Sequence, residues 1–261
     1  MNVTLPDGIR LWCACSGHGK PLMLLHGLGG CGGDWGMQLP ALNRHFHVIR
    51  PDLRGHGRSS HPADGYTIKQ MADDCAALLK RLALPRVHLA GISLGGMVAL
   101  QLALDFPQLV DRLVLVNSTP AVTPQTFMQR LELWARLAAT RRLSMRWTGF
   151  LLSWRLFPAR EQRLLRKLFL QRWSHCNAHS YHVTLRGLAG WTVLERLSQL
   201  QAPLLVISGD HDFFPLSAKQ LCAERAPRGR LVTIANSRHA SIIDQPEACT
   251  RILLDFFGGN S

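Results

Sequence analysis

Acidic residues, paired cysteines and long apolar runs are all scarce in this sequence, and each scarcity excludes something. No stretch of about twenty apolar residues is present, which is the length needed to cross a bilayer. Residues 1–8 lack the basic start and the long apolar region of a secretory signal peptide. We therefore predict a soluble, cytoplasmic protein with no transmembrane segment.

Cysteine occurs seven times, an odd number, and no two cysteines form a CxxC pair. Cys13 and Cys15 alternate along a predicted strand and face the same side, a pattern that does not suggest a disulfide. We expect the thiols to stay reduced, as is usual in the cytoplasm. No zinc-ligand spacing is visible, so the sequence implies no metal and no organic cofactor.

The shortage of acid is the strongest bias of the composition. Seventeen Asp and Glu stand against 30 Lys and Arg, so the net charge is +13 and the isoelectric point is near 10.3. Such a balance is common in proteins that bind nucleic acids. No basic leucine zipper or RNA-recognition signature accompanies the charge, which is concentrated in one segment beside a set of candidate catalytic residues. We predict no nucleic-acid partner.

A serine stands between two glycines at residues 91–95. The apolar run before it predicts a strand, and the largely apolar run after it predicts a helix. This context is typical of a nucleophile elbow, in which a serine occupies a strained strand-to-helix turn and flanking glycines prevent backbone collisions. The turn would expose the hydroxyl of Ser93 and place the amide of Leu94 at a helix N-terminus, where it favours a developing anion.

Two later strand-like runs carry the partners that a nucleophilic serine needs. The run at 203–209 leads into Asp210 and Asp212, and the run at 230–235 leads into His239. Catalytic groups gather at the carboxyl ends of strands in open parallel sheets. These side chains can therefore converge on the serine although they are distant in sequence.

With these motifs in the order serine, aspartate, histidine, the sequence resembles the alpha/beta-hydrolase family over nearly its whole length. The segment LLHGLGG at 24–30 resembles the family's HG loop. The resemblance implies that the amide of Leu28 joins that of Leu94 in an oxyanion hole. The segment PDLRGHGRS at 51–59 resembles the family's D-x-R-G-x-G-x-S loop, which implies a structural role.

The acid is to be chosen between Asp210 and Asp212, which lie on the same loop. The family usually places its acid three residues after the glycine that closes the strand, and Gly209 to Asp212 has this spacing. A few relatives keep the acid after the preceding strand, but the strand-like run at 113–116 is followed by Asn and Ser, with no carboxylate. The resemblance therefore implies Asp212, with Asp210 the second candidate.

The base is to be chosen among 12 histidines. His239 alone follows the last predicted strand, whereas His211 precedes the expected acid and is the second candidate. His26 belongs to the HG loop, where we expect hydrogen bonds to the backbone. A neutral imidazole at His239 would take the serine proton and return it to the leaving group.

The chain length suits one α/β domain with an insertion. Predicted strands alternate with helical runs, such as 67–84, in the first part of the chain, and the alternation resumes near 203. We predict an α/β fold with a mostly parallel eight-stranded sheet, helices on both faces and an inserted helical cap. The core is assigned to 1–119 and 197–261, and the cap to 120–196.

The predicted cap is basic and rich in tryptophan: residues 121–196 hold thirteen Lys and Arg, three acids and five of the seven tryptophans. Three interpretations stay open. Trp147, Phe150, Leu151 and Trp154 could form a helix face packed on the body, with the arginines in solvent. Trp147, Trp154 and Trp191 could instead line a substrate pocket whose arginines attract an anionic group. The helices could also dock weakly on an anionic membrane surface.

We predict a serine hydrolase of carboxylic esters or thioesters that forms an acyl-enzyme. The substrate would carry an apolar acyl or aromatic part, and an anionic partner such as acyl-CoA, an acyl carrier protein or a lipid fits the basic cap. A C–C bond hydrolase or an acyltransferase on the same scaffold is the alternative enzyme. The alternative of another class is a non-catalytic ligand-binding receptor of this fold.

Overall fold

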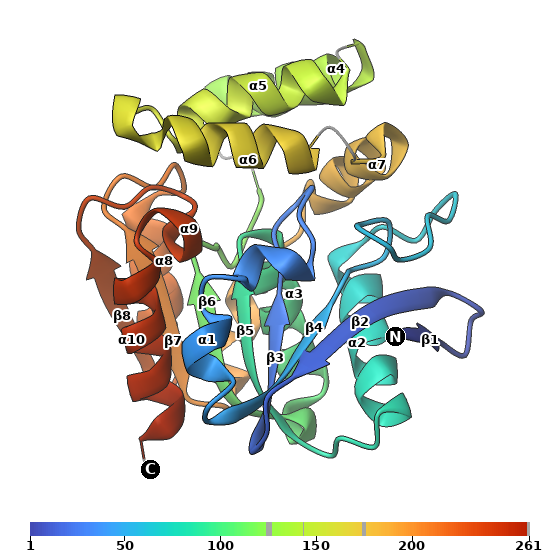
Figure 1. The fold of residues 1–261 in the computed structure, drawn as a ribbon, viewed down its shortest axis with the longest axis vertical. Coiled ribbons are helices and arrows are strands. Elements are labelled where there is room, and N and C mark those ends of the chain that lie inside the picture. Colours follow the sequence, from blue (N-terminus) through green and yellow to red (C-terminus); the bar gives the residue numbers. More distant parts are fainter. Residues whose placement is uncertain (124–126, 143, 174–175, 260–261) are drawn as a thin grey trace.

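The computed structural model describes residues 1–123, 127–142, 144–173 and 176–259 (Figure 1). Its centre is a sheet of eight strands in the order β1-β2-β4-β3-β5-β6-β7-β8. The strands are β1 (Asn2–Thr4), β2 (Arg10–Ser16), β3 (Lys20–Leu25), β4 (Phe46–Pro51), β5 (Val87–Ile92), β6 (Val110–Val116), β7 (Leu204–Gly209) and β8 (Gly229–Ile234). β2 pairs antiparallel with β1 and β4, and the other neighbours pair in parallel, which confirms the predicted sheet.

Helices cover both faces of the sheet, because successive strand residues point to opposite sides. Met23 and Leu25 pack with α2 (Ile68–Arg81), α3 (Leu94–Asp105) and α8 (Leu216–Arg225) on one face. Leu22 and Leu24 pack on the other face with α1 (Leu39–Leu42), α9 (Ser241–Asp244) and α10 (Pro246–Gly258). The apolar strands are therefore buried on both sides, as a parallel sheet requires.

The predicted helix at 67–84 is α2. Its first turn is capped by the Thr67 side chain, which accepts a hydrogen bond from the amide of Gln70 at 3.1 Å. Ile68 and Met71 begin the buried stripe that packs on the sheet. The helix ends at Arg81, three residues before the predicted end.

Between β6 and β7 the described residues form four helices, which lie above the carboxyl ends of the parallel strands (Figure 1). The helices are α4 (Phe127–Arg142), α5 (Met145–Leu156), α6 (Arg163–Trp173) and α7 (Ala178–Leu188). Short 3-10 turns complete the chain: η1 (Gly32–Trp35), η2 (Pro107–Leu109), η3 (Arg160–Gln162) and η4 (Leu194–Gln199). None of the helices in the described ranges combines the length and apolarity needed to span a bilayer.

Candidate active site

The turn between β5 and α3 holds Ser93 in a strained backbone conformation, with φ 54° and ψ −118°. Such a conformation is rare for a residue other than glycine and persists only where the surroundings enforce it. A Cβ on Gly91 would lie 2.2 Å from the carbonyl oxygen of Gly95, and one on Gly95 would lie 2.4 Å from that of Leu25. Both glycines of the motif are thus required by close backbone packing.

Two residues that line the same cavity as Ser93 have backbone amides without an acceptor. Leu94 is the first residue of α3, so its N–H has no acceptor within the helix. Leu28 follows β3 in the HG loop, and both leucines line the cavity together with Ser93. Neither amide donates a hydrogen bond to any residue in the described part of the chain. The pair is therefore free to receive an anionic oxygen.

His26 holds the HG loop in place through hydrogen bonds to the backbone. Its Nε2 accepts a hydrogen bond from the amide of Leu53 at 2.9 Å, which leaves Nδ1 to donate to the carbonyl of Gly27 at 2.8 Å. The imidazole is fully buried. It therefore positions the backbone that carries Leu28, and both of its bonds go to the backbone, as the sequence predicted.

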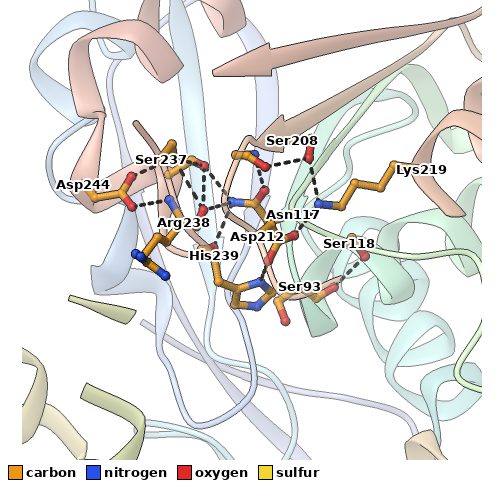
Figure 2. A network of polar contacts seen from close by, with 12 residues as sticks. Ser93, Asn117, Ser118, Ser208, Asp212, Lys219, Ser237, Arg238, His239 and Asp244 are labelled. Atoms are coloured by element: carbon orange, nitrogen blue, oxygen red, sulfur yellow. Dashed lines mark hydrogen bonds and ion pairs between the residues drawn. The ribbon is translucent and has the colours of Figure 1, made fainter. Parts of the chain in front are cut away.

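Figure 2 shows His239 between Ser93 and Asp212. His239 Nδ1 donates to Asp212 Oδ1 at 2.6 Å, since a carboxylate can only accept. Nε2 then remains without a proton and available as a base. The Ser93 side chain lies beside the ring, although no hydrogen bond joins these two residues in the structure. Such bonds are often long before substrate binds.

Asp210 is engaged elsewhere. Its two carboxylate oxygens accept hydrogen bonds from the amides of Asn236 and Ser237, both at 2.9 Å. It thus braces the loop that follows β8 and carries His239. The imidazole of His211 is largely exposed and lies 3.9 Å from Asp210. Of the two candidate acids, Asp212 is the one that contacts His239.

The second oxygen of Asp212 meets a group that the sequence did not reveal. Lys219, on α8, is fully buried, and its ammonium forms an ion pair with Asp212 Oδ2. The same ammonium donates to Ser208 Oγ at 2.8 Å. One carboxylate therefore bridges the imidazole and a buried cation (Figure 2). A lysine is almost never fully buried unless it is paired with an acid. Because the partner of Lys219 is Asp212, this lysine is part of the site.

Burial and charge shift the pKa of all three groups. Burial raises the pKa of Asp212, but the hydrogen bond and charge of His239, with the charge of Lys219, outweigh it, and the pKa is lowered. Burial lowers the pKa of His239, and the bond to Asp212 opposes this only in part. Burial likewise lowers the pKa of Lys219 against the attraction of Asp212. At neutral pH the arrangement favours a neutral imidazole beside an ionised carboxylate.

Asn117 ties together the strand ends that carry these groups. Its Nδ2 donates to the carbonyl oxygens of Arg238 at 3.0 Å and of His239 at 2.9 Å, and its Oδ1 accepts from the amide of Gly209 at 2.7 Å. Asp244 adds a bond from the amide of Arg238 at 2.8 Å (Figure 2). The backbone on both sides of the imidazole is thus held by the buried Asn117 and the half-buried Asp244.

Two aromatic rings hold the plane of His239. Phe213 stacks on the imidazole with ring centroids 3.8 Å apart, and Phe214 meets it edge-on at 5.4 Å. The guanidinium of Arg155, on α5, lies 4.7 Å from the centroid of the Phe213 ring. The stack restricts rotation of the His239 ring. Through Phe213 and Arg155 it also connects this ring to helix α5.

The cavity beside Ser93 has a volume of about 120 Å³. Most of its walls are apolar, and the charged residues at its edge are Arg136 and Asp34. Tyr181 accepts a hydrogen bond from Arg136 at 3.3 Å. The apolar lining residues are Leu28, Ile92, Leu94, Met97, Leu152, Leu156, Phe169, Trp173, Leu188, Phe213, Phe214, Ala240, Ile242 and Ile243.

A larger cavity of about 610 Å³ adjoins the first one. Phe169 and Trp173, on α6, line both. Arg58 and Arg172 are among the residues that line the larger cavity. The two spaces together can receive a small group next to Ser93 and a bulkier group behind the α6 aromatics.

The three tryptophans predicted to line a substrate pocket border neither of these cavities. Trp147 is 61% exposed, and Trp154 is 49% exposed with Arg166 over its ring. Trp191 is half-buried against the core and donates to Gln101 Oε1 at 2.9 Å. The prediction that these three tryptophans line the pocket is therefore corrected. Trp173 lines the cavity instead, and the sequence did not single it out.

The interpretation that Trp147, Phe150, Leu151 and Trp154 form a face packed on the body is corrected as well, because all four are exposed. The face of α5 that packs inward is a different stripe, made of Met145, Gly149, Ser153 and Leu156. Because α5 is apolar on two sides, its periodicity could not indicate which side turns inward.

No group of three His, Cys, Asp or Glu side chains in the described ranges is placed to hold a metal ion. The polar groups that converge near Ser93 are an imidazole, a carboxylate, a buried ammonium and two backbone amides. This set can activate a hydroxyl and stabilise an oxyanion.

The family model described as the alpha/beta hydrolase fold matches residues 20–246. The chain belongs to the alpha/beta-hydrolase family. It is 34% identical over 249 residues to the "Putative carbamate hydrolase RutD" of Yersinia enterocolitica, covering 91% of this chain and 87% of the relative. The crystal structure of a hydrolase from Pseudomonas aeruginosa PA01 matches with a TM-score of 0.91 and 32% identity, covering 99% and 98% of the two chains.

A further alpha/beta-hydrolase structure is described as Est816, an N-acyl homoserine lactone degrading enzyme. It matches with a TM-score of 0.84 and 30% identity, over 98% of this chain and all of the other. The Yersinia relative and the Pseudomonas structure are both named hydrolases. The chain is a hydrolase of this fold.

Proposed function

We propose that the protein hydrolyses small carboxylic esters or thioesters through an acyl-enzyme on Ser93. The observation that carries this proposal is the bond from His239 Nδ1 to Asp212, since it leaves Nε2 as a base at the cavity that Ser93 lines. The unpartnered amides of Leu28 and Leu94 support it. A non-catalytic receptor of this fold remains the alternative of another class, and repeated release of product distinguishes the two.

The proposed reaction begins when His239 Nε2 takes the Ser93 proton and the hydroxyl oxygen attacks the substrate carbonyl. The two amides bind the oxyanion, and each contributes roughly 3 kcal/mol to transition-state stabilisation. The imidazolium then protonates the leaving group, and a water molecule repeats the sequence to release the acid. Asp212 holds the ring and stabilises its positive charge throughout.

The size of the cavity limits the acyl part of the substrate. At about 120 Å³ it is smaller than the roughly 300–1,000 Å³ of pockets for drug-sized ligands. We therefore assign the acyl group to this cavity and the leaving group to the larger neighbouring one. A carbamate is the second candidate substrate, because similarity to RutD favours it and its small carbonyl head would fit the same cavity.

Nitrophenyl esters of increasing chain length test the assignment. We expect kcat/KM to be highest for acyl chains of up to about four carbons and to fall at least about tenfold for an octanoyl chain, because extra methylenes overfill a packed site.

Leu152→Ala, at the cavity wall, should move the preference to longer chains. The matched control is Leu151→Ala, one residue away on the exposed side. A preference for octanoyl esters in the unmodified protein would refute the assignment, and a nitrophenyl carbamate included in the panel ranks the second candidate.

Lys219→Met tests whether the buried cation tunes the base. The charged groups that act on His239 are Asp212, Lys219 and Arg136. Lys219 disfavours a second positive charge on the imidazole, so its removal should raise the pKa of His239. The acid limb of the kcat/KM profile should then move to higher pH, since the ring must lose its proton to act as a base.

The control is Lys69→Met, which removes an exposed lysine paired with Asp73 on α2. It should leave the pH profile unchanged. A Lys219→Met protein that folds, turns over slowly and keeps the original acid limb would show that the lysine only fills space.

A further inference from the structure

The outer surface of α4–α6 carries apolar side chains that, apart from Leu168, line neither cavity of the proposed site. Ten of the fourteen large apolar side chains that are exposed in the described part of the chain lie on it. They are Phe127, Met128, Leu131, Trp134, Trp147, Phe150, Leu151, Trp154, Leu164 and Leu168. We call this surface the outer face. In Figure 1, α4 and α5 form the end of the molecule farthest from both termini.

On α5 the exposed residues form a continuous stripe. Trp147, Phe150, Leu151 and Trp154 follow the spacing i, i+3, i+4, i+7 of one helix face. The Phe150 ring contacts the rings of Trp147 and Trp154 edge-on, with centroids 5.8 Å and 6.5 Å apart. The opposite stripe of the same helix already fills the inner side. A second apolar stripe needs a partner outside this chain.

The outer face is also strongly cationic. Its exposed cations that lie away from the cavities and from Phe213 are Arg130, Arg141, Arg142, Arg146, Arg160, Arg163 and Lys167. Glu161 is the one exposed acid among the side chains described in 127–173. Helix α5 itself contains no acid. The partner must therefore offer negative charge and apolar surface together.

A second copy of the chain does not meet this requirement, because two outer faces would set seven cations against seven. An anionic bilayer does meet it. Tryptophan and leucine enter the boundary between headgroups and acyl chains, while flanking arginines reach the lipid phosphates. We propose that the outer face of α4–α6 docks on the surface of a membrane rich in anionic lipid.

Docking would place the cavities close to the bilayer. Arg155 lies over Phe213, which stacks on His239, so α5 is in contact with the site below it. For this reason Arg155 is left unchanged in the test. The proposal concerns binding and does not depend on the reaction assigned to Ser93.

Co-sedimentation with vesicles tests it, using phosphatidylcholine alone and phosphatidylcholine with phosphatidylglycerol. We expect binding to the anionic vesicles to be at least about tenfold stronger than to the neutral ones. Raising the salt from about 0.1 M to about 1 M shortens the Debye length from about 10 Å to about 3 Å and should weaken the binding strongly.

Two variants separate charge from apolar contact. Arg141→Gln/Arg142→Gln/Arg146→Gln should weaken binding at least about tenfold. Its matched control, Arg81→Gln/Arg230→Gln/Arg251→Gln, removes the same charge from exposed positions on the core and should bind as the unmodified protein does.

Trp147→Gln/Leu151→Gln removes apolar surface without changing charge and should also weaken binding. Leu216→Gln/Val232→Gln is its control, at exposed positions in α8 and β8. All four proteins should keep their turnover of a soluble ester, because these side chains lie outside the reaction cavity.

Three outcomes would overturn the proposal. The first is equal binding to neutral and anionic vesicles, or no binding to either. The second is loss of vesicle binding by the core triple variant as large as that by the α4–α5 triple variant, which would make the effect one of net charge. The third is full competition by heparin with no effect of Trp147→Gln/Leu151→Gln, which would indicate an acidic macromolecule instead of a bilayer.

Discussion

Replacing Ser93 by alanine should lower turnover of a nitrophenyl ester by at least about a thousandfold, the scale seen when the nucleophile of a Ser-His-Asp set is deleted. Without the hydroxyl no acyl-enzyme can form, and the residual rate would come from the two amides and substrate binding alone. The strained backbone at this position is set by Gly91 and Gly95, so alanine should leave the fold unchanged.

Labelling by a fluorophosphonate separates the chemistry from the fold. The probe should attach to the unmodified protein and fail to attach to Ser93→Ala, while both give the same circular dichroism and melting temperature. Ser118→Ala serves as the control. Its hydroxyl donates to the Ser93 carbonyl oxygen at 2.8 Å, so it touches the turn without facing the substrate.

Near-normal turnover by purified Ser93→Ala would contradict the assignment of the nucleophile. Labelling without repeated release of product would instead favour the receptor alternative, since a receptor can keep an activated serine without completing a cycle. Multiple-turnover assays with a soluble ester distinguish these results.

The elements that sequence alone predicted are those whose chemistry is local. Gly91, Ser93 and Gly95 act within one turn, and the Gly209 to Asp212 spacing lies within one loop. The order of these motifs along the chain, with alternating strands and helices, was enough to predict the parallel sheet. Features that depend on local backbone geometry can therefore be recognised from a single sequence.

The groups that escaped prediction act across the sheet. Lys219 looks like any surface lysine of a helix, and only the structure shows that it is buried against Asp212. Asn117 was set aside because it is not a carboxylate, yet its amide is what the site uses. The sequence alone does not distinguish the environment of Trp147 from that of Trp173. The packing of α5 and α6 determines that Trp173 lines the cavity and that Trp147 is exposed.

Asp212→Asn should abolish most activity, whereas Asp210→Asn should not. Each oxygen of Asp212 has its own partner: Oδ1 accepts from His239, and Oδ2 faces the ammonium of Lys219. Lysine can only donate, so an asparagine here must turn its oxygen towards Lys219 and its NH₂ group towards His239. The imidazole would then carry its proton on Nε2 and could not accept one from Ser93.

We expect kcat of Asp212→Asn to fall about 10⁴-fold, the cost of the wrong histidine tautomer in another serine hydrolase. Asp210→Asn should stay within about tenfold of normal turnover and lose about 1 kcal/mol of stability, because it removes one acceptor for a loop amide. Loss of activity only in Asp210→Asn would reverse the choice of acid.

The buried lysine makes the tautomer explanation testable on its own. In the double variant Asp212→Asn/Lys219→Met the asparagine is no longer forced into one orientation, and its oxygen can turn to His239 Nδ1. Activity should then recover at least about tenfold over Asp212→Asn, a coupling between neighbours that a double-mutant cycle measures. If the two substitutions simply add, the charge of the carboxylate matters more than the tautomer it selects. Recovery would show that a cation on the far side of the acid determines which nitrogen of the imidazole is the base.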